Sequence, residues 1–144
     1  MHTLRRVVQD IHLIHSAPGA TVLEASTRMT EGRVGAIPIL DGERLVGVFS
    51  ERDLMTRVVV AGRDPGATSV ESVMTREVVT AELDESVDRC LEKMQRAGCR
   101  HLPVVHDGRL ISMISMRDLL RDEIEEQTEE IRHLRAYIHQ DSPA

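Results

Sequence analysis

The sequence repeats itself at an offset of 65 residues, and this repeat constrains the fold more than any other feature. Pro38 recurs as Pro103, and the run Ser50–Leu54 is matched by the run Ser115–Leu119. Residues 21–54 laid over 86–119 give nine identities in 34 pairs without a gap. A repeat of this length exceeds a solenoid unit and corresponds to a whole supersecondary motif used twice. Two such motifs packed about a pseudo-twofold axis create paired clefts, which are candidate binding sites.

Composition excludes several classes of protein. The 144 residues fit one compact domain, and 41% hydrophobic with 29% charged residues is ordinary for a globular protein. With one Phe, one Tyr and no Trp, the core is expected to be aliphatic, and recognition by aromatic stacking is not expected. The net charge of −6 argues against a nucleic-acid partner, because phosphate binding needs a basic surface. There is no run of 18 apolar residues and no apolar signal core, so we expect no membrane association and a cytoplasmic location.

The two cysteines do not indicate a metal site. Cys90 and Cys99 lack the C-x-x-C spacing, and the seven histidines form no ligand pattern near them. We therefore expect two small apolar side chains in a reducing compartment, and no bound metal.

Each copy of the repeat is predicted to form a β-α-β-β-α series. A short strand at 13–14, and its counterpart at 78–80, opens each series. Helices follow at 21–32, where Thr21 and Glu24 form a capping box, and at 86–97. Hairpins follow at 36–49 and 101–114, with turns at Asp41-Gly42 and Asp107-Gly108. Ser50 and Ser115 then cap the last helix of each copy.

The fold class is therefore α/β (α+β), with two βαββα repeats and a long C-terminal helix. Turn residues fill the connector 61–67. We assign repeat 1 to 5–62, a linker with a short helix to 63–75, repeat 2 to 76–122, and a helical extension with a tail to 123–144.

The final helix is predicted to continue to about Ile138. Its stripe has spacings of 4, 3, 4, 3 and 4 residues and one polar position, which is a heptad pattern: Leu120, Ile124, Gln127, Ile131, Leu134 and Ile138. The helix could fold back on its own domain or pair with a second subunit. We favour pairing with a second subunit, because the apolar stripe extends beyond the end of the domain that would otherwise cover it.

The doubled motif resembles a tandem pair of cystathionine β-synthase (CBS) domains. The resemblance rests on the segments 35–40 and 47–53, their counterparts 100–105 and 112–118, and Val73-Met74-Thr75 at the start of the second unit. It covers roughly residues 5–122, and the long C-terminal helix is similar to that of stand-alone bacterial CBS-pair proteins. The family implies a non-enzymatic module that binds adenine nucleotides in two clefts, forms a disc-shaped homodimer and signals to a partner protein.

The resemblance implies that Asp53 and Asp118 bind the ribose hydroxyls, with Ser50 and Ser115 beside them. These roles are chemically reasonable, because a carboxylate accepts two hydroxyl hydrogen bonds and its charge strengthens them. The alternative is that each Ser-x-x-Asp is only a helix cap with an acidic third residue. The Ser-x-x-Asp motif occurs in both copies of the repeat, directly after the same predicted strand, and this recurrence favours the interpretation that it binds a ligand.

The remaining candidate residues make the two clefts unequal. Arg100 and His101 match phosphate-contacting positions of the family, whereas their counterparts Gly35 and Ala36 leave room for an adenine edge. Ser112 in place of Gly47 is expected to narrow the second cleft. The other candidates lie on the strands and at the helix starts, and a solvent-exposed helix face is an alternative for two of them, Arg57 and Arg117. The complete additional set is His15, Ile37, Pro38, Arg52, Arg57, Thr80, Leu102, Pro103 and Arg117.

The sequence thus favours a regulatory module with AMP, ADP, ATP or NAD as a regulatory ligand and no catalytic cofactor. A ligand-free structural or dimerisation adaptor that acts through the C-terminal helix is the alternative. An enzyme is disfavoured, because no nucleophile–base pair, metal cluster or phosphate-binding Gly-x-x-x-x-Gly-Lys-Ser/Thr loop is present.

Overall fold

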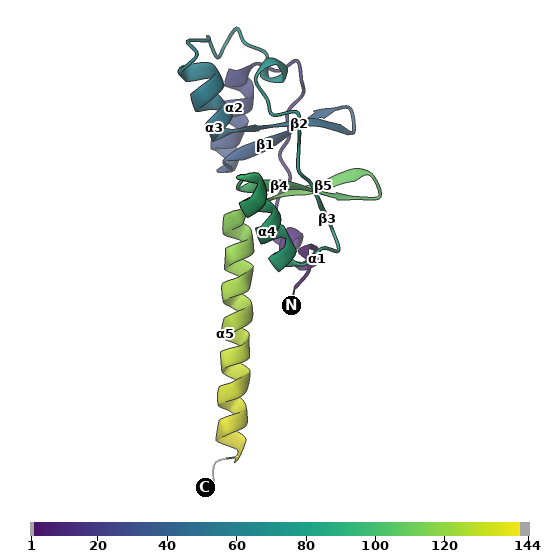
Figure 1. The fold of residues 1–144 in the computed structure, drawn as a ribbon, viewed down its shortest axis with the longest axis vertical. Coiled ribbons are helices and arrows are strands. Elements are labelled where there is room, and N and C mark those ends of the chain that lie inside the picture. Colours follow the sequence, from purple (N-terminus) through teal and green to yellow (C-terminus); the bar gives the residue numbers. More distant parts are fainter. Residues whose placement is uncertain (1, 142–144) are drawn as a thin grey trace.

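The computed structural model describes residues 2–141 and confirms the predicted class: two mixed α/β units followed by a long helix (Figure 1). Two short helical turns, α1 (Leu4–Val7) and η1 (Val8–Asp10), open the chain. The first unit consists of α2 (Val22–Gly32), β1 (Ala36–Asp41), β2 (Arg44–Ser50), α3 (Glu51–Asp53) and the π-helix η2 (Leu54–Val59). The short helix η3 (Val70–Ser72) lies in the connector, and the second unit consists of β3 (Ala81–Glu82), α4 (Val87–Ala97), β4 (His101–His106), β5 (Arg109–Ser115) and α5 (Met116–Asp141).

An antiparallel hairpin forms the centre of each unit, β1–β2 in the first and β4–β5 in the second. The second hairpin turns at Asp107-Gly108 as predicted, and both residues have a positive φ, 50° and 74°, as a type I′ turn requires. The first hairpin differs from the prediction. Asp41 still pairs with Arg44, so the turn is formed by the two residues between them rather than by Asp41-Gly42.

The opening strand of each unit lies later in the chain than predicted. Residues 13–14 and 78–80 lie outside any strand. Pairing begins instead at Ser16 and Ala81, which are equivalent positions of the repeat. Ser16 forms an isolated parallel bridge, in which its N–H donates to the Pro38 carbonyl at 3.1 Å and its carbonyl accepts from the Leu40 N–H at 2.9 Å. Only one or two residues of each opening segment pair with the hairpin. A prediction from apolar character therefore locates the strand a few residues too early in the chain.

The predicted helix starts are confirmed by their caps. Thr21 and Glu24 form the expected capping box, with the Glu24 N–H donating to Thr21 Oγ1 at 3.1 Å and the Thr21 N–H donating to Glu24 Oε2 at 3.0 Å. The Ser86 hydroxyl accepts from the Arg89 N–H at 3.1 Å at the start of α4. Helix α2 ends at Gly32, but the left-handed residue that terminates it is Arg33, with φ of 56°.

Each unit buries its own apolar cluster. The N-terminal segment, which precedes the first unit, completes the cluster of the second, and the connector between the units completes the cluster of the first. Leu4 is fully buried in the cluster of the second unit. Val70 and Val73 are buried in the cluster of the first unit, around Phe49. This crossover locks the two units together, because neither core is complete without a segment from outside its own βαββ portion.

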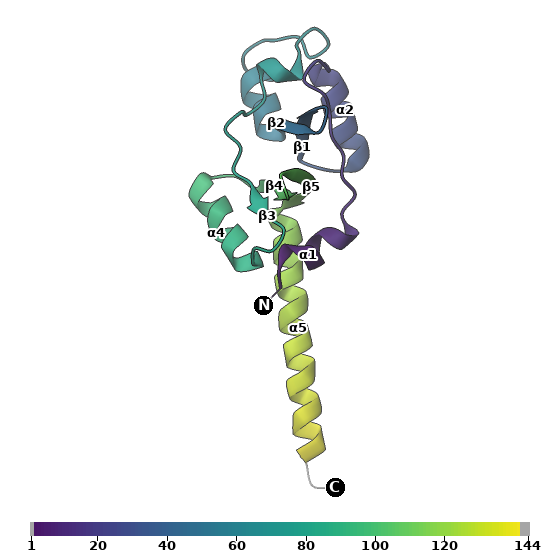
Figure 2. The ribbon, with the colours of Figure 1, turned by 90° about the vertical axis from the view of Figure 1, so that its right-hand side faces the viewer.

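Helix α5 leaves the domain soon after it begins. Its first turns pack on α4, α1 and β5, and Leu119 is fully buried. The rest of the helix projects from the second unit as a single rod (Figures 1 and 2). No described helix is both long and apolar enough to cross a membrane.

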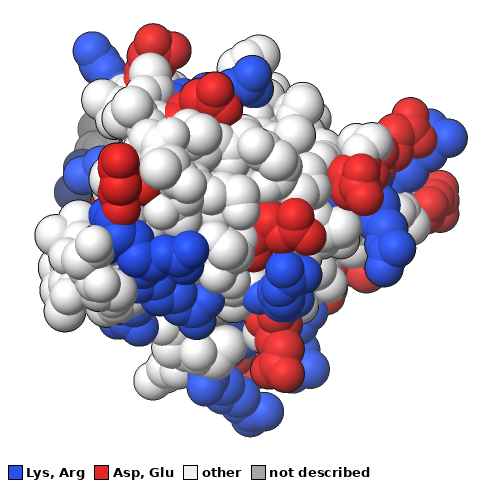
Figure 3. Space-filling view, turned by 90° about the horizontal axis from the view of Figure 1, so that it is seen from above, with Lys and Arg blue, Asp and Glu red and all other residues white. Residues whose placement is uncertain are grey.

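The end of the molecule formed by the first unit carries charges of both signs (Figure 3). Acidic side chains are scattered there around an uncharged centre, and basic side chains gather on one side. This face therefore lacks the continuous basic surface that a nucleic-acid backbone requires.

Candidate functional site

A cleft of about 1010 Å³ opens between the two units. The end of α2, the start of β1, the start of β4 and the first turns of α5 contribute to its walls, together with the segment after η1. Seven of the residues predicted from the sequence line it: Gly35, Ala36, Arg100, His101, Ser115, Arg117 and Asp118. Its volume is at the upper end of the range of small-molecule sites and is sufficient for a nucleotide.

Asp118 lies in the first turn of α5, where the sequence places a carboxylate at the N-terminus of a helix. Its Oδ2 accepts the Ser115 N–H at 2.8 Å, and the Ser115 hydroxyl accepts the Asp118 N–H at 3.1 Å. Within the part of the chain that the structure describes, no side chain donates to the carboxylate. One carboxylate oxygen is therefore available to a ligand, and the helix N-terminus favours its negative charge.

Asp53 is the counterpart of Asp118, but its carboxylate is committed to the fold. It is only 5% exposed. Oδ2 accepts the Ser50 N–H at 3.0 Å and the Ser50 hydroxyl at 3.1 Å, and the Thr75 hydroxyl lies 3.2 and 3.3 Å from the two carboxylate oxygens. The Arg57 Nε lies 3.8 Å away. A ligand could bind Asp53 only by displacing these partners.

The segment around Thr75 explains why the two aspartates differ. Thr75 and Val48 exchange two backbone hydrogen bonds of 2.8 and 2.9 Å, so this segment covers the end of β2. Met74 fills the space left by Gly47, since a methyl group on that glycine would collide with the Met74 sulfur. In the other unit the residue equivalent to Thr75 is Asp10, which lines the open cleft. Ser112, which we expected to narrow the second cleft, is buried and is not part of the lining.

His101 lies between the two units against the backbone of Gly35. A methyl group on Gly35 would lie 3.2 Å from His101 Cε1 and 3.3 Å from Nε2. Burial lowers the pKa of His101 below its ordinary value of 6.5, although Glu51 and Asp118 oppose this shift. The ring is therefore mostly neutral at pH 7 and can donate or accept one hydrogen bond in the cleft.

Four arginines line the cleft, and none forms an ion pair with another described residue: Arg33, Arg100, Arg117 and Arg121. Arginine binds phosphate through paired N–H donors, so this set suits an anionic group. The sequence prediction missed two of them, together with Asp10. Arg121 could have been found, because it lies one helical turn after Asp118 on the same face of α5. Arg33 carried no signal, since only its left-handed conformation at the end of α2 directs it here.

The other predicted site residues lie outside this cleft. Ile37, Pro38, Leu102 and Pro103 are buried in the hairpins, Ser50 binds Asp53, and Arg52 is exposed. The side chain of Arg57 donates to the Val73 and Met74 carbonyls at 3.2 and 2.9 Å, so it fastens the segment that closes the first cleft. His15 is exposed and Thr80 half-buried, and their carbonyls accept from Arg28 and Lys93.

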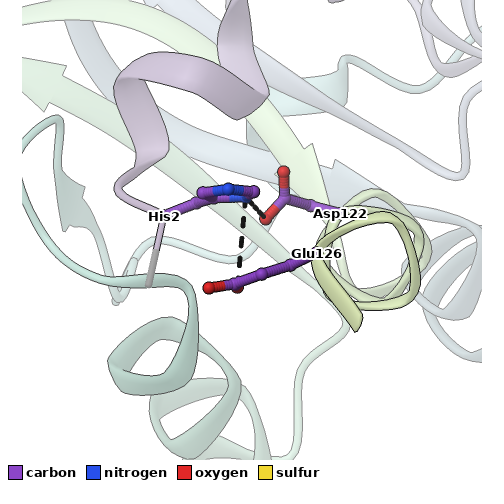
Figure 4. Close-up of side chains that lie close together, drawn as sticks. All are labelled: His2, Asp122 and Glu126. Carbon is purple, nitrogen blue, oxygen red and sulfur yellow. Dashed lines mark hydrogen bonds and ion pairs between the residues drawn. The ribbon is translucent and has the colours of Figure 1, made fainter. Parts of the chain in front are cut away.

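One group of side chains has a metal-like composition: His2, Asp122 and Glu126, whose potential ligand atoms lie within 4.8 Å of one another (Figure 4). Arg6, which can only donate, lies 2.9 Å from His2 Nε2. His2 Nδ1 must then carry the proton that it shares with Asp122 Oδ2 at 2.8 Å, so it has no lone pair for a metal. This group joins the N-terminal segment to α5.

Comparison with known proteins is consistent with this geometry. The family described as "CBS domain" matches residues 8–60 and 70–125. A mitochondrial CBS domain-containing protein of Arabidopsis thaliana, CBSX3, is 34% identical over 82% of this chain, which spans only 60% of that protein. A protein with CBS domains from Burkholderia ambifaria has a TM-score of 0.83 and 32% identity over 88% of this chain and 96% of its own. The CBS domain protein PAE2072 of Pyrobaculum aerophilum, solved in complex with AMP, has a TM-score of 0.74 and 26% identity over 81% and 89%.

Proposed function

Since this chain belongs to the CBS domain family, we propose that it is a regulatory module that binds an adenine nucleotide in the cleft between its two repeats. The observation that carries the proposal is the carboxylate of Asp118. One of its oxygens accepts no hydrogen bond from a described residue, and its cleft also holds four arginines that form no ion pair within residues 2–141. A ribose diol and a phosphate group occur together in AMP, ADP, ATP and NAD. The AMP complex of PAE2072 supports this class of ligand.

Each part of the nucleotide has a matching group in the cleft. The free oxygen of Asp118 accepts hydrogen bonds from the ribose hydroxyls, which charge makes stronger than neutral ones. Arg100 and Arg121 bind the phosphate, with the neutral ring of His101 as an additional donor. Gly35 and Ala36 leave space and backbone groups for the adenine edge, and Asp10 is an acceptor for its exocyclic amine.

The proposal assigns one nucleotide to each chain rather than two. Binding at Asp53 would break the contacts of its carboxylate with Ser50 and Thr75. A buried carboxylate that loses such partners carries a desolvation cost of about 1–3 kcal/mol or more. The Asp118 cleft involves no such loss, so it fills first.

A homodimer is the proposed form of the module. Exposed apolar side chains occupy equivalent positions on η2 and α5: Met55 is 58% and Val59 63% exposed, and Leu120 is 47% and Ile124 64% exposed. The repeat thus presents two matching apolar patches on one molecule, which suits a symmetric interface. A nucleotide would act by favouring one geometry of the dimer over another.

A structural adaptor is the second candidate, and it is favoured by the apolar stripe that continues along α5 beyond the domain. In that case the cleft would have no regulatory ligand, and the helix alone would make the functional contact.

Thermal unfolding in the presence of nucleotides separates the two candidates. AMP, ADP, ATP, NAD, NADH and S-adenosylmethionine would be tested with adenosine and inorganic phosphate as part-ligands. A ligand at 100 times its Kd adds about 2.7 kcal/mol to the free energy of unfolding, so at least one nucleotide should raise the melting temperature by several degrees more than either part-ligand. If none of them changes the melting temperature, the module does not bind an adenine nucleotide and the adaptor is favoured.

A further inference from the structure

The distal part of α5 has an exposed apolar stripe that no other described residue of this chain covers. The helix runs to Asp141, whereas the family match ends at residue 125. Ile131 is 50%, Leu134 61% and Ile138 64% exposed. The rod stands clear of both units in two perpendicular views (Figures 1 and 2). No described element of the chain reaches this stripe, so a helix that covers it would have to come from a second molecule.

The spacing of the stripe fixes the heptad positions. A step of three residues leads from a to d, and a step of four leads from d to the next a. The a positions are therefore Ile124, Ile131 and Ile138, and the d positions are Leu120, Gln127 and Leu134. In parallel coiled coils, β-branched residues at a with leucine at d favour two strands over three or four. The composition thus points to a dimer with Gln127 opposite its own copy.

The charges beside the stripe favour a parallel orientation. The e positions are Arg121, Thr128 and Arg135, and the g positions are Glu123, Glu130 and Tyr137. Parallel strands bring g of one helix near the following e of the other, so Glu130 meets Arg135 of the second copy twice across the symmetry axis. Antiparallel strands would bring g near g and e near e, which opposes like charges.

We infer that α5 forms a parallel two-stranded coiled coil with α5 of a second copy of this chain, over residues 120–138. This inference deepens the proposed homodimer by assigning its orientation. Because α5 begins directly after Ser115, parallel pairing places the second repeats of the two copies side by side. The two Asp118 clefts then lie at the base of one shared coiled coil, so a ligand at Asp118 contacts the same helix that holds the dimer together.

Disulfide trapping at the end of the seam tests the orientation. Ile138→Cys would be introduced into a Cys99→Ser background, with Cys90 retained because it is fully buried. In a parallel pair the two Ile138 positions are neighbours. In an antiparallel pair of these helices the same positions lie 18 residues apart along the axis, about 27 Å at 1.5 Å per residue. Ala136→Cys is the matched control, since position f points away from the seam.

The expected result is a dimer by sedimentation equilibrium, with a covalent dimer after mild oxidation of Ile138→Cys and at least tenfold less of it from Ala136→Cys. A monomer would overturn both the coiled coil and the homodimer. A dimer without the disulfide, or with equal trapping at both positions, would overturn the parallel coiled coil and leave the homodimer standing. Nucleotide binding is measured separately, so its failure is distinguishable from either result.

Charge exchange provides an independent test of the g–e′ pairing. Glu130→Arg and Arg135→Glu each oppose like charges in a parallel homodimer, so each should weaken association several-fold. A mixture of the two variants restores both pairs and should yield more heterodimer than the statistical half. A purely statistical mixture would contradict the pairing.

Discussion

The different environments of the two aspartates predict that Asp53→Ala and Asp118→Ala destabilise the protein by different amounts. Sequence alone makes the two residues equivalent, since each is the aspartate of a Ser-x-x-Asp motif at the same place in the repeat. In the structure, Asp53 is 5% exposed and accepts from Ser50 and Thr75. Among the described residues, only the Ser115 N–H donates to the Asp118 carboxylate. The two substitutions therefore remove different numbers of contacts.

The magnitudes follow from these contacts. Asp118→Ala removes one side of a capping interaction, which costs about 1 kcal/mol. Asp53→Ala leaves three donors without their charged acceptor: the Ser50 N–H and the hydroxyls of Ser50 and Thr75. Each unpaired donor costs about 1–1.5 kcal/mol in this part-buried site, so the total loss is about 3–5 kcal/mol. The partly exposed Arg57 adds little to this figure. The difference between the variants should be about 2–4 kcal/mol.

Urea denaturation followed by far-ultraviolet circular dichroism measures this difference, because the chain has no Trp and only one Tyr. For a chain of this size each kcal/mol corresponds to roughly 3–4 °C in melting temperature, so Asp53→Ala should melt about 10 °C or more below the wild type. Thr75→Val is the control, since it removes one donor to Asp53 and should show an intermediate loss. Equal losses for the two alanine variants would refute the assignment of Asp53 to the fold.

Three further predictions concern side chains near the cleft and in the core. The lowered pKa of His101 means that, below about pH 6.5, the unfolded chain takes up a proton that the folded chain resists. The free energy of unfolding should therefore fall as the pH drops below about 6.5, and His101→Gln should reduce this fall. An undiminished fall in His101→Gln, measured by urea denaturation at each pH, would contradict this reasoning. Burial raises the pKa of Cys90 to about 11, so its thiol stays protonated and unreactive at pH 8. Iodoacetamide should therefore modify Cys99 alone in the native protein, as measured by mass spectrometry. Labelling of both cysteines at equal rates would contradict this prediction. Gly35→Val should press on the His101 ring and weaken nucleotide binding at least tenfold in a titration; an unchanged Kd would place the adenine elsewhere.

Much of the fold could be predicted because the repeat supplies each local signal twice. The capping box at Thr21, the turn at Asp107-Gly108 and the cap at Ser115 depend on a few adjacent residues, and all three are confirmed. The opening strands were placed too early, because their pairing depends on which residue reaches the hairpin rather than on apolar character. Ser16 pairs there although it is polar.

The candidate site was harder to predict, because the repeat suggests two similar clefts. The difference arises from Thr75 and Asp10, which lie before the hairpins and outside the Ser-x-x-Asp motifs. Thr75 is bonded to the first aspartate, whereas an acid at the equivalent place cannot donate to the second. The offset of 65 residues makes Asp10 and Thr75 equivalent positions of the repeat. Only the structure shows that the Thr75 segment pairs with β2 and covers its end.

Isothermal titration of AMP into the wild type, Asp53→Asn and Asp118→Asn tests the central claim most directly. Asparagine keeps the size of the side chain and removes the charge, so changes in Kd report the ligand contact rather than the helix cap. We predict one AMP per wild-type chain and a Kd about 10–100-fold weaker for Asp118→Asn, which corresponds to the 1.5–3 kcal/mol of a charged hydrogen bond. Asp53→Asn should bind within about threefold of the wild type by the same energy scale. Loss of binding in Asp53→Asn with retention in Asp118→Asn would contradict the account, as would two equal sites per chain.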